Sequence, residues 1–161
     1  MIKSEHTFTV AEYDSIDELN EDDAWLLNEA RAATQFAYAP YSNFNVGAVA
    51  RLINGEIVTG TNQENASYPA GLCAERVLLS SVASQHPAIA VETIAVSYNN
   101  MKGKSDTPIS PCGICRQSLA EYQQRNQKPI RIILSGMEGK VFIIENAAHL
   151  LPLAFSAEDL K

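Results

Sequence analysis

Residues 89–98 form a largely apolar stretch, and no other feature of the sequence limits the possible folds as much. A strand with apolar residues on both faces needs a covering layer on each side, because an uncovered apolar face would contact water. Such a strand belongs in the interior of a sheet. Helical spacing of apolar residues before and after it predicts the layers that cover it.

Strand and helix patterns elsewhere extend this prediction. We expect strands at residues 44–53, 56–61, 89–98, 130–135 and 140–144. We expect helices at residues 21–36, 74–85, 113–126 and 146–150. The first two strands meet at Asn54-Gly55, a dipeptide that accepts the backbone angles of a tight hairpin, so they should pair antiparallel. The expected fold is α/β, with three α/β/α layers around a central mixed five-stranded sheet.

The length of the chain fits one domain with one core. Of its 161 residues, 46% are hydrophobic and 19% are charged, which is close to the average of globular proteins. Residues 1–20 mix acidic, hydroxyl and a few apolar side chains without sustained periodicity. We therefore expect residues 1–20 to be a poorly ordered or loosely docked N-terminal extension, and residues 21–161 to form the domain.

The charge of the chain disfavours several classes of function. The formal net charge is −7 and the basic residues are scattered, so the protein should repel a nucleic-acid polymer. No apolar run has the length of a membrane span, and the N-terminus lacks the basic and apolar regions of a signal peptide. These features predict a cytoplasmic protein that acts on a small molecule, without a nucleic-acid or membrane partner.

The chain has three cysteines, an odd number that cannot complete a set of disulfides. Cys73 precedes one predicted helix, and Cys112 and Cys115 begin another within the segment Pro-Cys-Gly-Ile-Cys. Helix N-termini favour thiolates, the form of cysteine that binds metal. Three thiolates predict a Zn²⁺ site whose fourth position is open to water, as in catalytic zinc sites. The alternative is that the cysteines are small residues of the core.

Glu75 lies two residues after Cys73, close enough to reach both a water molecule and a substrate. A carboxyl group in this position can accept a proton from water and release it to a substrate, as a general acid–base catalyst does. We predict that Glu75 is the catalytic proton shuttle. Its alternative role is that of an ordinary glutamate in the first turn of a helix, where the dipole favours it.

These segments carry a resemblance to a known family. Cys73-Ala74-Glu75 followed by Pro111-Cys112-Gly113-Ile114-Cys115 resembles the signature of the zinc-dependent cytidine deaminases. The first ligand is cysteine instead of histidine, which is similar to the small homotetrameric class with three cysteine ligands. The resemblance runs from about residue 41 to residue 160 and implies a cytidine deaminase-like fold, bound Zn²⁺ and a homotetramer.

Two further segments extend the resemblance, and they imply a free nucleoside as substrate. They are Pro40-Tyr41-Ser42-x-Phe44-x-Val46-Gly47-Ala48 and Asn62-x-Glu64-Asn65-Ala66-x-Tyr68-Pro69. By resemblance, Asn62 and Glu64 bind the ribose 3′-hydroxyl, Phe44 packs against the base, and the backbone at Ala66 holds the exocyclic groups of the base. From sequence spacing alone, Asn62 and Glu64 could equally make local turn bonds.

The resemblance assigns roles to four more residues. Arg76 and Gln117 would lie just outside the zinc ligands, where the arginine can offset the negative charge of three thiolates on one zinc ion. Phe155, in the C-terminal segment, would enter the site of a neighbouring subunit, and Tyr68 would do the same. By default, aromatic side chains such as these belong to a core or an interface.

The expected function is zinc-dependent hydrolytic deamination of cytidine and deoxycytidine to uridine and deoxyuridine, with release of ammonia, in pyrimidine salvage. One alternative is a deaminase of a modified or antibiotic cytosine nucleoside, similar to the blasticidin deaminases. A second alternative, from a different class, is a zinc-binding module without catalytic activity.

Overall fold

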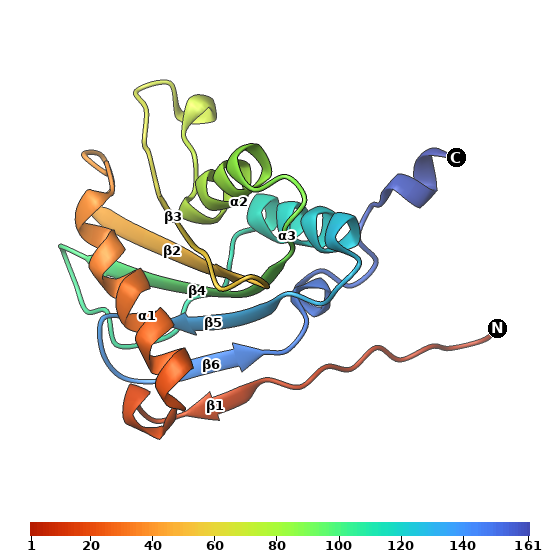
Figure 1. The fold of residues 1–161 in the computed structure, drawn as a ribbon, viewed down its shortest axis with the longest axis horizontal. Helices are drawn as coiled ribbons and strands as arrows, with labels where there is room; N and C mark the ends of the chain where they lie inside the picture. The colour runs from red at the N-terminus through yellow and green to blue at the C-terminus, as the bar shows by residue number, and fades with distance from the viewer.

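The computed structural model describes residues 1–161 and contains a single mixed sheet of six strands (Figure 1). The strands are β1 (Ala11–Tyr13), β2 (Phe44–Leu52), β3 (Ile57–Thr61), β4 (Val91–Asn100), β5 (Arg131–Ser135) and β6 (Val141–Ile144). Their order across the sheet is β1-β6-β5-β4-β2-β3. Only β4 and β5 run parallel, and every other neighbouring pair is antiparallel.

Helices cover both faces of the sheet. Helix α1 (Glu21–Ala33) lies on one face, and α2 (Ala74–Gln85) and α3 (Gly113–Asn126) lie on the other (Figure 1). The short 3₁₀ helices are η1 (Ile16–Glu18), η2 (Thr34–Phe36), η3 (Tyr68–Ala70), η4 (Ala147–Leu150) and η5 (Ala157–Leu160). The predicted helix at residues 21–36 is thus an α-helix that ends in one 3₁₀ turn. No helix has the length and apolar character needed to cross a bilayer.

The predicted central strand is confirmed. Residues of β4 alternate between two hydrophobic cores, with Ile94 and Val96 in the larger core under α2 and α3, and Ala95 in the smaller core under α1. Because both faces are covered, the strand can be apolar on both sides, as the sequence required. The three-layer α/β/α fold is confirmed with it.

The first hairpin differs from the tight turn expected at Asn54-Gly55. Gly55 has a positive φ of 85°, whereas Asn54 does not, so the two-residue turn with two left-handed positions is not formed. The Gly55 amide donates to the Leu52 carbonyl at 2.9 Å, and the Leu52 amide donates to the Glu56 carbonyl at 2.9 Å. These bonds close a three-residue loop, in which glycine supplies the left-handed residue.

The prediction of five strands is wrong by one. The sixth strand, β1, pairs antiparallel with Val141–Ile143 of β6. Four side chains that follow or belong to it pack against the core under α1: Ala11, Tyr13, Ile16 and Leu19. The second half of the extension is therefore part of the sheet and its core instead of loosely docked. A three-residue strand is too short to show an alternating pattern, which explains why the sequence did not reveal it.

Candidate metal centre and active site

The three cysteines come together although the sequence separates them. The Sγ atoms of Cys73, Cys112 and Cys115 all lie within 4.8 Å of one another. The distance is 3.8 Å between the Sγ atoms of Cys73 and Cys112, and 3.6 Å between those of Cys112 and Cys115. A tetrahedral zinc with bonds of about 2.3 Å to sulfur holds its sulfur ligands about 3.8 Å apart. The three thiols therefore fit zinc, and their spacing is too long for a disulfide.

Two helix N-termini hold the cysteines in place. Cys73 is the N-cap residue of α2 and Cys112 is the N-cap residue of α3, and Cys115 lies one turn further into α3. Helix α2 approaches β3 so closely that a Cβ atom at Gly60 would lie 2.5 Å from the carbonyl oxygen of Ala74. Glycine at this position therefore lets α2 lie against the sheet, which fixes the place of Cys73.

Charge and hydrogen bonding prepare one thiol for metal binding. A hydrogen bond with Cys115 and a weaker one with Cys112 lower the pKa of Cys73 to about 6, although burial and the charge of Glu75 oppose this change. The same hydrogen bond with Cys73, together with burial, raises the pKa of Cys115. One thiolate is therefore available near neutral pH, and a cation can replace the remaining thiol protons.

Glu75 lies beside the cysteines and is almost completely buried. Only 6% of its surface is exposed. Burial raises the pKa of this carboxyl, while a hydrogen bond with Cys115 partly opposes the increase. A carboxyl group with a raised pKa holds a proton more readily than an ordinary glutamate, which suits a general acid–base catalyst.

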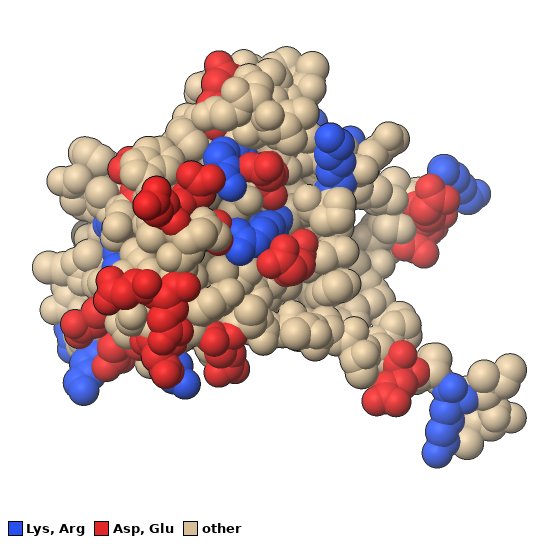
Figure 2. All heavy atoms as spheres, turned by 60° about the horizontal axis from the view of Figure 1, so that its bottom comes forward, with Lys and Arg blue, Asp and Glu red and all other residues tan.

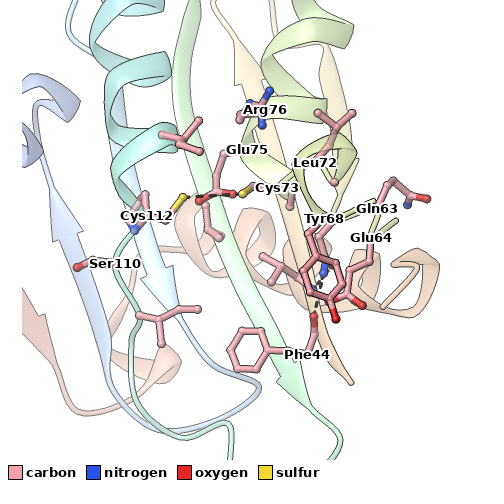
Figure 3. Close-up of a pocket in the computed structure, with 18 of the residues that line it drawn as sticks. Phe44, Gln63, Glu64, Tyr68, Leu72, Cys73, Glu75, Arg76, Ser110 and Cys112 are labelled. Atoms are coloured by element: carbon pink, nitrogen blue, oxygen red, sulfur yellow. Dashed lines mark hydrogen bonds between the residues drawn. The ribbon is translucent and has the colours of Figure 1, made fainter. Parts of the chain in front are cut away.

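A cavity of about 530 Å³ opens over Glu75 and the thiols, a size suited to a small-molecule ligand. Its walls come from β2, from the loop before α2 and from the loop before α3 (Figure 3). Eight residues singled out from the sequence line it: Phe44, Asn62, Glu64, Tyr68, Cys73, Glu75, Arg76 and Cys112. Cys115 lies beneath them and is fully buried.

Asn62 and Glu64 reach the cavity with their polar atoms already engaged. The Asn62 side chain accepts from the Val46 amide at 2.7 Å and donates to the Phe44 carbonyl at 2.9 Å. The Glu64 carboxylate accepts from the Tyr41 amide at 2.9 Å and from the hydroxyl of Ser42. These hydrogen bonds outweigh desolvation and hold the pKa of Glu64 below its ordinary value, so the carboxylate is charged.

Three predicted residues lie away from the cavity wall. Ala66 is exposed in the loop between β3 and α2. Gln117 donates a hydrogen bond to the Phe155 carbonyl at 2.8 Å, and 60% of the Phe155 surface is exposed. Gln117 thus connects helix α3 to the C-terminal segment, and neither residue lines the cavity. Their predicted roles, like those of the other substrate contacts, stay predictions.

Sequence reasoning missed several residues that shape the site. Arg116 donates to the Pro111 carbonyl at 2.8 Å and to the Leu150 carbonyl at 3.2 Å, which anchors the loop that carries Cys112. Its position directly after a cysteine was the only available signal. Ile109 and Ser110 line the cavity beside the cysteines, and their loop showed no pattern in the sequence.

Comparison with known proteins decides which family this geometry represents. The family model for the cytidine and deoxycytidylate deaminase zinc-binding region matches residues 20–128. The chain belongs to this deaminase family. Membership confirms the resemblance found in the sequence and establishes the protein as a zinc-dependent hydrolytic deaminase, and its three-cysteine cluster has the geometry to hold a metal ion.

Curated relatives and solved structures agree with this assignment. A cytidine deaminase of Halalkalibacterium halodurans is 36% identical over 142 residues, which cover 87% of this chain and 98% of the relative. The crystal structure of a cytidine deaminase from Burkholderia pseudomallei has a TM-score of 0.69 and 38% identity, and the match covers 85% of this deaminase and all of that chain. A cytidine deaminase structure from Mycobacterium tuberculosis has a TM-score of 0.63 and 29% identity, and covers 84% of this chain and 98% of that one.

Proposed function

We propose that this deaminase converts cytidine and deoxycytidine to uridine and deoxyuridine, with water consumed and ammonia released. One observation carries the proposal: the buried carboxyl of Glu75 lies against the three-thiol cluster at the floor of a cavity of nucleoside size. The relatives described above, which are named cytidine deaminases, support the choice of base.

Glu75 has the position required of the proton carrier. Zinc held by the three thiolates would make water at the site easier to deprotonate near neutral pH. Glu75 would accept one proton of the attacking water and deliver it to N3 of the cytosine as the water oxygen bonds to C4. It would then carry the proton of the new C4 hydroxyl to the amino group, whose bond to C4 breaks to release ammonia. The raised pKa of Glu75 helps it to hold each proton between these steps.

The ribose and base contacts complete the proposal. Asn62 retains one amide hydrogen, and Glu64 retains free lone pairs, after the backbone bonds that fix them. We assign these two groups to the ribose 3′-hydroxyl, Phe44 to the base and the backbone at Ala66 to its exocyclic groups. Because the protein already holds both polar side chains, binding would order few additional groups.

The charge distribution supports a small uncharged substrate. The net charge is −7, and on the face drawn in Figure 2 acidic side chains gather in clusters whereas basic side chains are scattered among them. Such a surface repels phosphodiester chains. The proposal further includes a cytoplasmic enzyme of pyrimidine salvage, and a homotetramer in which Tyr68 and Phe155 reach a neighbouring site. Their exposure, 75% for Tyr68 and 60% for Phe155, is compatible with such contacts.

Mixing the zinc-loaded enzyme with cytidine, and separately with deoxycytidine, tests the proposal. We expect the ultraviolet absorbance of cytosine to decrease, with one ammonia released for each nucleoside converted. Absence of both signals in protein shown to contain zinc would contradict the proposal. A panel of modified cytosine nucleosides would then separate a deaminase of different specificity from a zinc-binding module without turnover.

A further inference from the structure

Tyr98 lies directly behind Phe44, and nothing in the sequence drew attention to it. The two rings stack with their centroids 4.8 Å apart and their planes 10° apart. They share one face of the sheet, because Tyr98 of β4 pairs with Val46 of β2, two residues along from Phe44. Only 5% of the Tyr98 surface is exposed, and Tyr98 itself does not line the cavity.

The phenol hydroxyl ties Tyr98 to a second wall of the cavity. It donates a hydrogen bond to the carbonyl oxygen of Thr107 at 2.9 Å. Pro108 follows Thr107 and restricts its backbone to extended conformations. The next residue, Ile109, lines the cavity at the start of the segment that leads to Cys112. Tyr98 therefore contacts the Phe44 ring on one side and the backbone of this segment on the other.

The orientation of the Phe44 ring depends on its contact with Tyr98. Its backbone is fixed, because its carbonyl accepts from Asn62 and its amide donates to the Ser42 hydroxyl at 3.1 Å. Its ring, however, is partly exposed and faces the cavity (Figure 3). Tyr98 is the aromatic partner against which that ring stacks, and the hydroxyl bond to Thr107 keeps Tyr98 from turning.

We propose that Tyr98 is a positioning residue that orients the Phe44 ring for the substrate base and aligns it with the segment at Ile109. This inference rests on the proposed function, which assigns Phe44 to the base. Tyr98 acts through Phe44 and takes part in no proton transfer. A contact of this kind holds substrate and transition state equally, so its loss should raise KM and leave kcat nearly unchanged.

Three variants test the proposal by their kcat and KM for cytidine and by their melting temperatures. Tyr98→Leu removes the stacked ring, and we expect KM to increase about fivefold, within the range known for aromatic pairs, with kcat within about twofold of wild type. Tyr98→Phe keeps the ring but loses the hydrogen bond to Thr107, so KM should increase by no more than about twofold. Tyr122→Leu removes a buried tyrosine of α3 that lies outside the cavity, so it should lower the melting temperature without raising KM.

An unchanged KM in Tyr98→Leu, or an equal increase in Tyr122→Leu, would overturn the proposal. If Tyr98→Leu does not fold, Tyr98→Met fills the same space without a flat ring and takes its place, with the same expected increase in KM.

A second experiment tests the positioning role of Tyr98 even if the proposed function fails because wild type converts no cytosine nucleoside. It measures the rate at which the Phe44 ring flips, by nuclear magnetic resonance. We expect slow flips in wild type and Tyr98→Phe and at least about tenfold faster flips in Tyr98→Leu; equal rates would contradict the positioning role.

Discussion

Glu75 and Cys73 are two residues apart, yet their surroundings move their pKa values in opposite directions. Thiol hydrogen bonds lower the pKa of Cys73, whereas burial raises the pKa of Glu75. The first change favours a metal ligand, and the second favours a group that carries protons. The start of helix α2 would thus supply both proposed roles, because the two side chains meet different partners.

Replacing Glu75 by Gln separates these roles. The amide keeps the size of the side chain and cannot carry a proton, so we expect zinc content to be unchanged and kcat to decrease by about 10³-fold. Zinc can be measured by mass spectrometry and turnover by ammonia release. Glu121→Gln, the same chemical change at an exposed position of α3, is the matched control and should leave both unchanged. Activity retained in Glu75→Gln would refute the proton-carrier role.

Asp23 is a second residue whose charge has a measurable consequence. It is 2% exposed, and Arg131 donates to it at 2.8 Å and Asn20 at 2.7 Å. These partners outweigh the effect of burial and hold the pKa of Asp23 below its ordinary value. The stabilisation is therefore present above about pH 4, the unfolded value, and is lost as the pH falls through the lower folded value.

We expect Asp23→Asn to lower the free energy of unfolding by about 2–3 kcal/mol at pH 7, because Arg131 loses its buried charged partner and keeps only the exposed Glu145. Denaturation at several pH values measures this effect. The difference from wild type should shrink below about pH 4. Asp22→Asn, at a neighbouring exposed acid, should have little effect, since its ion pair with Arg51 is long, at 3.9 Å, and solvated. A difference that does not depend on pH would exclude the ion pair as its cause.

At the scale of elements, the sequence predicted the helices best and the N-terminal strand not at all. Helices α2 and α3 begin directly after Cys73 and Cys112, as predicted, because polar residues and turn formers interrupt the apolar spacing there. The three cysteines and Glu75 could be singled out because they carry a short, specific spacing, and the structure brings them together. Arg116 and Tyr98 were missed because their roles depend on contacts across the fold, which no local pattern encodes.

Deletion of residues 1–14 would remove β1 and test its contribution to the sheet. The loss of its ladder with β6 and of the packing of Ala11 and Tyr13 should lower the free energy of unfolding by about 2 kcal/mol, which corresponds to a decrease in melting temperature of about 5 °C. Deletion of residues 1–8 leaves β1 in place and serves as the control. Equal melting temperatures for the two deletions would show that the strand adds no stability.

For the whole molecule, zinc bound as we propose would join two helices whose first cysteines, Cys73 and Cys112, are 39 residues apart in the chain. A ligand that binds only the folded state stabilises it by about 4 kcal/mol at a thousandfold excess over its dissociation constant. Chelation should therefore abolish turnover and lower the melting temperature by several degrees. Added Zn²⁺ should restore both, whereas Mg²⁺, which prefers oxygen ligands, should not. An unchanged melting temperature after proven zinc removal would contradict this linkage.

The three residues of β1 also determine what the sheet presents to other molecules. Without them, β6 would be the edge strand, and its sequence Val-Phe-Ile-Ile would offer unpaired N–H and C=O groups along an apolar segment. Exposed apolar edges can recruit strands from other chains, and native proteins reduce this risk by covering such an edge with a short, polar or irregular segment. The N-terminal extension thus protects the enzyme against aggregation through its own sheet, a property that concentrated solutions would reveal before any assay of activity.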